Sequence, residues 1–127
     1  MPSLEDLASG PAILRRFLEA GGQASISQDV MAAAALGEPI AVEVVRTAGH
    51  ALGATIGLLV NVMDPELVVL GGGLGLDEGL YRETLVQSAR DTIWWDIHRR
   101  LPIVSAETGA AAGIIGAATA AWLKIER

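Results

Sequence analysis

Residues 61–75 (NVMDPELVVLGGGLG) restrict the possible folds of this chain more than any other segment. The apolar helix that precedes them is expected to end at Asp64, because Pro65 disfavours helical backbone angles in the residue before it. Residues 67–70 are apolar at every position and include two adjacent valines. This pattern predicts a strand buried on both faces, as in a parallel sheet. The segment therefore indicates an α/β fold.

Three glycines, Gly71, Gly72 and Gly73, follow that strand. A backbone without Cβ atoms can turn sharply and lets a ligand approach closely. In open α/β sheets, ligands bind beyond the carboxyl ends of the strands, so a nucleotide could bind at this turn. A tight turn without any ligand would give the same local pattern. The segment also fails to match the dinucleotide-binding fingerprint, since Leu76 occupies the place of its third glycine.

Composition limits the size and the surroundings of the fold. A chain of 127 residues forms one domain at most. Apolar residues make up 51% of it, and the mean hydropathy is +0.43. Part of this apolar surface is therefore expected to be buried against a partner or a second copy of the chain. The sequence has no cysteine, which excludes disulfides and thiolate metal sites.

Charge and segment length exclude two further classes of protein. The net charge of −6 opposes nonspecific nucleic-acid binding, which needs a basic surface, so no direct contact with nucleic acid is expected. The N-terminus lacks the basic and apolar regions of a signal sequence. The longest apolar runs, residues 51–63 and 109–123, are shorter than the roughly 18 residues of a membrane span. We therefore expect a cytoplasmic protein that does not enter a membrane.

Short helices are predicted before a long one. Ser3 and Asp6 have the spacing of a capping box, in which each side chain accepts a hydrogen bond from the other residue's amide. Pro11, in a first turn, indicates a second helix, which ends at a pair of glycines. Ser27 is expected to cap a third helix over residues 27–35, and its four consecutive alanines favour that structure.

The longest helix is predicted over residues 39–62. Gly49, Gly53 and Gly57 stand four residues apart within it and share a face. Each glycine costs about 1 kcal/mol relative to alanine in a helix interior. Three of them on one face therefore indicate that a neighbouring backbone comes very close. His50 lies in the same helix, where an ordinary structural histidine is favoured over a ligand or a base.

A helix capped by Asp77 and ending near residue 92 should follow the glycine turn. Its expected buried stripe consists of Leu80, Leu85, Val86, Ala89 and Ile93. Trp94 and Trp95 extend this apolar surface, and packing in the core or in a subunit interface is favoured over a stacking platform for a ligand. Residues 98–100, His-Arg-Arg, are interpreted as a solvated connector.

Residues 101–105 predict a second strand, in which Pro102 can stand only where the ladder needs no amide donor. A last helix is predicted over residues 109–121, where Gly109, Gly113 and Gly116 indicate close packing, with the long helix as a candidate neighbour. Two strands joined by a helix make a βαβα unit with a right-handed crossover. Both outer edges of such a parallel sheet are unpaired, so the sheet is incomplete and further strands of a larger α/β domain are expected.

Three segments together form a known pattern. They are ALGATIGLLVNVMDPELVVLGGGLG (residues 51–75), PIVSAETGAAAGIIGAATAAW (residues 102–122) and SLEDLASGPAILRR (residues 3–16), and their most specific part is NxxxPExxVLGGG. These segments resemble the ROK family, which contains sugar kinases of the glucokinase type and sugar-responsive transcriptional repressors. The resemblance implies a single domain over residues 1–127, similar to the C-terminal lobe of an actin-like, ribonuclease-H-like kinase.

The resemblance also implies ligands. ATP, with Mg²⁺ in the complete enzyme, would lie in the cleft between two lobes, with Gly71, Gly72 and Gly73 against its adenosine end. A hexose would be the substrate. Glu5 matches an acidic residue that looks like a ligand of the sugar hydroxyls in family kinases, and a carboxylate is a suitable acceptor for them. Without the resemblance, Glu5 is interpreted as an ordinary first-turn glutamate.

The chain departs from the family pattern at positions that carry chemistry. Ser3 stands at the position of the last zinc cysteine, and Ala110 and Ala111 replace positions that are often acidic. No residue matches the phosphate-binding loop, or the aspartate that deprotonates the sugar hydroxyl in the family. We therefore assign no catalytic residue, no metal ligand and no zinc to this chain, and we expect it to be inactive in isolation.

Three functions remain open at this point. The first is the C-terminal lobe of an ATP-dependent hexose kinase, which contributes the adenosine side of the nucleotide cleft and a dimer interface. The second is the effector-binding and dimerisation portion of a ROK transcriptional repressor. The third is a helical interaction module. A homodimer is expected in each case, because of the apolar excess, the incomplete sheet, and Trp94 with Trp95.

Overall fold

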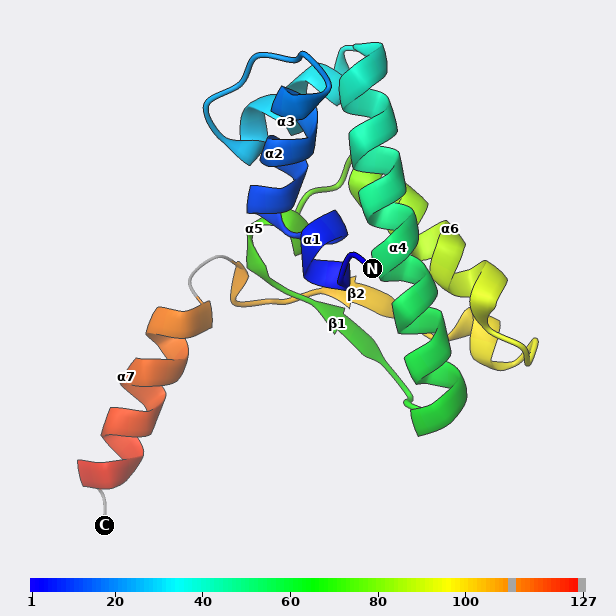
Figure 1. Ribbon diagram of the computed structural model, residues 1–127. Coiled ribbons are helices and arrows are strands. Elements are labelled where there is room, and N and C mark those ends of the chain that lie inside the picture. The colour runs from blue at the N-terminus through cyan, green and yellow to red at the C-terminus, as the bar shows by residue number, and fades with distance from the viewer. Residues whose placement is uncertain (110–111, 126–127) are drawn as a thin grey trace.

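The structure is a computed structural model that describes residues 1–109 and 112–125, without the side chains of residues 112–114. Helices predominate, and the two strands form a small sheet beside them (Figure 1). The elements in chain order are α1 (Leu4–Ala8), α2 (Gly10–Glu19), α3 (Ser27–Ala35), α4 (Pro39–Met63), β1 (Val68–Leu70), α5 (Gly72–Gly75), α6 (Leu80–Thr92), the 3-10 helix η1 (His98–Arg100), β2 (Ile103–Ser105) and α7 (Ala112–Ile125). This order confirms the predicted βαβα unit and a helix-rich α/β fold.

Helix α4 packs along α6, and the contact is close because glycine lines it. A Cβ atom added at Gly49 would lie 2.7 Å from the carbonyl oxygen of Tyr81, and one at Gly57 would lie 2.7 Å from that of Ala89. At Gly53 it would lie 2.8 Å from the Cβ of Ser88 and would overlap the backbone of the same helix. The predicted close approach is confirmed, and the neighbouring backbone is that of α6.

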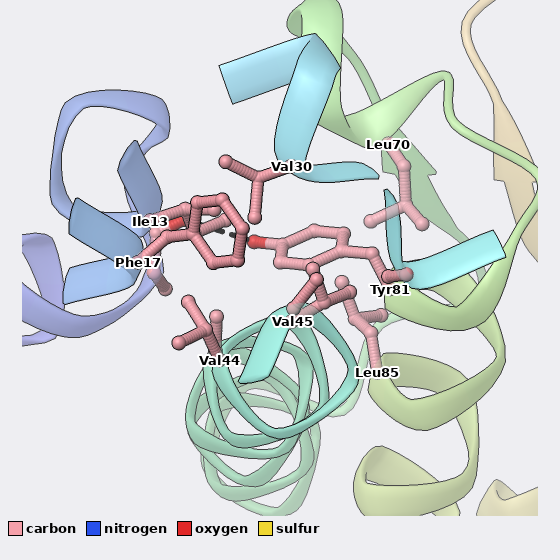
Figure 2. Packing of buried hydrophobic residues seen from close by; sticks show 12 residues of the cluster. Ile13, Phe17, Val30, Val44, Val45, Leu70, Tyr81 and Leu85 are labelled. Atoms are coloured by element: carbon pink, nitrogen blue, oxygen red, sulfur yellow. Dashed lines mark hydrogen bonds between the residues drawn. The ribbon is translucent and has the colours of Figure 1, made fainter. Parts of the chain in front are cut away.

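The N-terminal helices pack on the first half of α4 and form the main core with it. Tyr81, from α6, lies inside this core, and Figure 2 shows its ring among side chains of α2, α3, α4 and β1. The fully or nearly buried members of the cluster are Ala8, Ile13, Phe17, Val30, Ala34, Ala41, Val44, Val45, Ala48, Leu70, Tyr81 and Leu85. The sequence pattern did not single out Tyr81, although it is the largest fully buried side chain in the described part of the chain.

Two of the predicted helix starts are as expected. Ser3 Oγ accepts from the Asp6 amide at 3.2 Å, and the Asp6 carboxylate accepts from the Ser3 amide at 2.9 Å, so the capping box is present. These bonds hold the pKa of Asp6 below its ordinary value, the bond from the Ser3 amide most of all. Ser9 caps α2 by accepting from the amide of Ala12 at 3.2 Å, with Pro11 in the first turn.

Two other predicted caps are wrong. Ser27 is the first residue of α3 and its N-cap is Ile26; the Asp29 carboxylate accepts from the amides of Ser25 and Ile26. These two bonds also lower the pKa of Asp29, because they stabilise its charged form.

Asp77 does not cap the helix after the glycine turn. A short helix, α5, intervenes, and α6 begins at Leu80 with Gly79 as its N-cap. The Asp77 carboxylate instead accepts from the Gly79 amide within the connecting turn, at 3.1 Å.

The sheet has two parallel strands, with Val68 beside Ile103, Val69 beside Val104 and Leu70 beside Ser105. Val68, Leu70 and Ile103 face the helices and pack on their apolar residues. Val69 and Val104 face away and are 54% and 40% exposed. The prediction that the first strand is buried on both faces is therefore wrong for this chain, because no described element covers the outer face of the sheet.

The turn after α6 is attached to the end of α4. Asn61 donates from Nδ2 to the carbonyl of Thr92 and accepts at Oδ1 from the amide of Trp94, both at 3.0 Å. The Nε2 atom of His98 lies 2.8 Å from the Asp64 carboxylate. The interpretation of residues 98–100 as a solvated connector is therefore wrong in part. They form η1, which this pair holds against the end of α4.

Trp94 and Trp95 do not pack in the core of this chain. Their side chains are 76% and 65% exposed, and Ile97 beside them is 73% exposed. The sequence analysis left three roles open for this pair. Packing in the core is excluded for the described residues, while packing in a subunit interface and stacking on a ligand are still open.

Helix α7 extends away from the other elements (Figure 1). A Cβ atom added at Gly109 or at Gly116 would meet no atom within 4 Å. The expected close packing at these two glycines is therefore wrong, and α4 is not their neighbour. The surroundings of Gly113 lie outside what the structure describes, as do Ala110 and Ala111 entirely.

The contact between α4 and α6 gives a test of the fold. We expect Gly53→Ala to lower the free energy of unfolding by about 1–3 kcal/mol, the usual cost of overpacking, because the new methyl group has no space beside Leu85 and Ser88. Urea unfolding followed by circular dichroism measures the change. Gly116→Ala is the matched control: it adds the same methyl group to an open helix face and should leave stability unchanged or raise it. Equal stability of Gly53→Ala and the wild type would contradict the packing described here.

Candidate functional site

A pocket of about 480 Å³ opens at the carboxyl end of β1, where the three glycines stand. We call it the glycine pocket. Figure 1 shows α5 at this end of the strand, beside the N-terminal helices. The pocket is lined by Ala8 and Gly10 from the N-terminal segment, Ser27 and Gln28 from α3, Leu52 from α4, Leu70–Gly75 from the strand and turn, and Tyr81 and Leu85 from α6.

The glycine turn forms one wall of this pocket. Gly71 continues the extended backbone of β1, and Gly72 begins α5 with a φ of +78°, a conformation that glycine adopts without strain. A Cβ atom added at Gly72 or Gly73 would meet no atom within 4 Å. The glycines are therefore not needed to pack against another protein segment. They leave a section of backbone open to the pocket.

A second wall comes from the start of α2 and of α3. A Cβ atom at Gly10 would lie 3.2 Å from Ser27 Oγ and 3.9 Å from a terminal carbon of Leu74. The beginnings of two helices and the glycine turn thus meet at one place, although more than 60 residues of sequence separate Gly10 from Leu74. The sequence analysis predicted one wall, Gly71 to Gly73, and missed this one.

Tyr81 and Leu85 close the bottom of the pocket. The Tyr81 hydroxyl donates to the carbonyl of Ala8 at 3.1 Å, so this buried polar group has a partner. Figure 2 shows this bond, which runs from the core towards the N-terminal helices. Burial raises the pKa of Tyr81 above its ordinary value, because the phenolate would lose its hydration.

The lining determines what the pocket can bind. Among the described residues it contains no carboxylate, imidazole, ammonium or guanidinium group. Its polar groups are backbone amides and carbonyls, a serine hydroxyl, a glutamine amide and the Tyr81 hydroxyl, which donates to the carbonyl of Ala8. Such a pocket suits a neutral group with flat apolar faces and a few hydrogen-bonding atoms. It offers no general base and no ligand set for a hard metal ion.

The other candidate residues lie outside the glycine pocket. Glu5 is exposed in the first turn of α1 and does not line it. His50 is exposed on α4, and its carbonyl accepts from Ser88 at 2.8 Å. Within residues 1–109 and 112–125, no three His, Cys, Asp or Glu side chains come together as a metal site would require. No helix in the same residues is long and apolar enough to cross a membrane.

Comparison with known proteins supports the family resemblance that the motif in residues 61–73 indicated. The model of the "ROK family" matches residues 3–124. The chain belongs to the ROK family. A curated relative, the bifunctional enzyme NanE/NanK of Brucella melitensis, is 41% identical over 118 residues, which are 91% of this chain and 21% of the relative. The chain described here thus spans about a fifth of the length of this relative.

Solved ROK structures have the same fold. A ROK hexokinase from Thermus thermophilus matches with a TM-score of 0.78 and 34% identity, over 98% of this chain and 42% of that one. A ROK glucokinase from Streptomyces griseus, in complex with glucose and AMPPNP, matches with a TM-score of 0.77 and 25% identity, over 91% and 43%. A ROK transcriptional regulator, described as a homologue of the E. coli MLC protein, gives 0.68 and 27% over 80% and 28%. The fold is therefore a partial actin-like lobe of the ROK type.

The buried tyrosine gives a test of the bottom of the pocket. Because its pKa is raised in the folded state, the unfolded chain releases the proton first, and the free energy of unfolding should fall as the pH rises through about 10. Urea unfolding between pH 8 and pH 11 should show that this fall is smaller in Tyr81→Phe, which has no group to titrate. Tyr81 is the only tyrosine, so its phenolate absorbance can be followed directly. A titration midpoint in the folded chain at or below the ordinary value of 10.0 would contradict the buried hydroxyl.

Proposed function

We propose that this chain forms the adenosine side of the nucleotide cleft in an ATP-dependent hexose kinase of the ROK family, as a single domain over residues 1–127. The observation that carries this proposal is the meeting of the glycine turn with the starts of α2 and α3 around the glycine pocket. The proposed use of ATP also implies a cytoplasmic protein, because ATP is available in that compartment.

The lining of the pocket supports adenosine over the other parts of the ligands. Adenine is flat, neutral and able to pack against apolar side chains, while ribose can bond to backbone groups. Gly71, Gly72 and Gly73 would let either part approach the backbone without obstruction. The phosphates of ATP need cationic groups and Mg²⁺, and no charged side chain among the described residues lines this pocket. The site therefore fits adenosine and does not fit a metal ion, so we assign neither magnesium nor zinc to these residues.

We propose that Glu5 accepts from sugar hydroxyls, at a place separate from the adenosine. Its carboxylate is exposed on α1 and does not line the glycine pocket, so it is open to a ligand other than adenosine. A hydroxyl that attacks ATP needs a general base. The chain offers none around the pocket among its described residues, so we propose that it does not transfer phosphate by itself.

The alternative is the effector-binding and dimerisation portion of a ROK repressor. The likeness to the regulator structure favours it, with a TM-score of 0.68 over 80% of this chain. Such a portion would bind an effector and leave DNA contacts to another segment, since the net charge here is −6. The likeness to the hexokinase is greater, at 0.78 over 98%, so the kinase is our first proposal.

We also propose a homodimer, formed through the exposed apolar end of α4 and the tryptophan pair beside it. Val62 and Met63 are 81% and 70% exposed. Trp94, Trp95 and Ile97 are also exposed, and the amide of Trp94 is bonded to Asn61 next to Val62. Tryptophan is enriched among the residues that dominate binding energy in interfaces. An apolar area of this kind on one end of a chain is typical of an interaction surface.

Calorimetric titration with ADP tests the proposed nucleotide site. We expect the 127-residue chain to bind ADP, and Gly73→Val to weaken binding by at least tenfold, because its side chain would project into the open pocket without backbone strain. Gly116→Val, on an open face of α7, is the matched control and should bind as the wild type does. A coupled assay with ATP, Mg²⁺ and a panel of hexoses should show no turnover. Binding that Gly73→Val leaves intact would remove the nucleotide from the glycine turn, and rapid turnover would refute the proposed inactivity.

Light scattering with sedimentation tests the proposed dimer. We expect the wild-type chain to be dimeric at micromolar concentration and a Trp94→Ser, Trp95→Ser variant to dissociate at least tenfold more easily, since two large exposed side chains would leave the interface. Leu36→Ser is the matched control, because Leu36 is 90% exposed at the C-cap of α3, shortly before α4 begins, and should not affect association through the other end of α4. A monomeric wild type at high concentration would overturn the dimer.

A further inference from the structure

The two walls of the glycine pocket are attached to adjacent residues of one helix. Tyr81 and Arg82 occupy the first turn of α6, and both make hydrogen bonds to other elements. Tyr81 bonds to Ala8 and Arg82 bonds to Gly75, and these two lining residues belong to different walls of the pocket.

Tyr81 holds the wall made by the N-terminal helices. Its hydroxyl donates to the carbonyl of Ala8 at 3.1 Å, and Ala8 is the last residue of α1. Ser9 and Gly10 follow directly, and Gly10 is the residue of this segment that faces Ser27 and Leu74. The bond is buried, so water does not compete for either group.

Arg82 holds the wall made by the glycine turn. Its Nη1 donates to Ser105 Oγ at 3.0 Å and to the carbonyl of Gly75 at 3.5 Å, and its Nη2 donates to the carbonyl of Ile103 at 3.2 Å. The guanidinium group thus connects the end of α5 with both ends of β2. All three acceptors are neutral oxygens. Arg82 therefore holds this wall mainly through the planar arrangement of its donors, and less through its charge.

We propose that Tyr81 and Arg82 are positioning residues that set the separation of the two pocket walls and thereby the affinity for the adenosine group. The inference rests on the proposed function for its ligand, but the geometry stands without it. Arg82 does not line the pocket, so it acts through Gly75 and β2. The close contact between α6 and Gly49 of α4 holds both residues in place. A Cβ atom added at Gly49 would lie against the Tyr81 carbonyl.

The test uses the 127-residue chain and five variants, two of which are controls. Tyr81→Phe and Arg82→Gln each remove the bonds to one wall. Ser88→Ala and Arg90→Gln are matched controls on the same helix. Ser88 donates a part-buried bond to the carbonyl of His50, and Arg90 donates to the carbonyl of Arg99; neither residue lines the pocket. Amide hydrogen exchange measures the mobility of each wall, and ADP titration measures affinity.

We expect each pocket variant to loosen its own wall. Tyr81→Phe should speed exchange at residues 9–13 about fivefold, and Arg82→Gln should do so at residues 72–77, as loss of one net hydrogen bond predicts. Both should weaken ADP binding about fivefold or more, while the controls change neither measurement. Arg82→Lys keeps the charge and should behave like Arg82→Gln, because lysine lacks the planar set of donors.

The outcomes separate this inference from the proposed function. Unchanged exchange at both walls would overturn the positioning role, and so would equal effects of the control variants, which would indicate a general effect on stability. Recovery of wild-type behaviour by Arg82→Lys would overturn the argument from geometry. Failure of the wild type to bind ADP would refute the proposed function, while the exchange data would still decide whether Tyr81 and Arg82 position the walls.

Discussion

The close contact between α4 and α6 is the constraint on which the rest of the structure depends. Gly49, Gly53 and Gly57 remove the side chains that would keep the two backbones apart, and Tyr81, Leu85 and Ala89 present their carbonyl groups to the space that results. Each glycine weakens α4 as an isolated helix by about 1 kcal/mol. The close packing and the area that it buries must offset this cost. The contact also fixes both ends of α6: its first turn enters the main core, and its last turn is bonded to Asn61 at the end of α4.

The glycine pocket is a consequence of that arrangement. Because α6 begins inside the core, Tyr81 can reach the end of α1 while Arg82 reaches β2 and the glycine turn. The lining is neutral, and the groups that could carry charge lie on other surfaces. This separation supports the proposal that the chain holds the neutral adenosine of a nucleotide, while the phosphates and the chemistry belong to another place in the proposed kinase.

The exposed apolar surfaces agree with the same interpretation. The outer face of the sheet presents Val69 and Val104, and the end of α4 presents Val62 and Met63 beside two tryptophans. A two-stranded parallel sheet is seldom stable with one apolar face in water. The chain corresponds to 42% of the length of the hexokinase from Thermus thermophilus. The proposed homodimer would cover the second surface with another copy of the chain.

The sequence by itself determined the family, the order of the main helices and strands, and most of their limits, but not the short helices α5 and η1. Pro65 predicted the end of α4, and the apolar run after it predicted β1. The spacing of Gly49, Gly53 and Gly57 predicted a close neighbouring backbone. These features could be predicted because their causes act over a few residues along the chain. One wall of the candidate site, Gly71 to Gly73, could be predicted in the same way. The sequence did not determine the other wall, the role of Tyr81 and Arg82, or the exposure of Trp94 and α7. Only the tertiary structure decided these features, because they depend on which elements distant in sequence meet in space, and local propensity carries no information about such meetings.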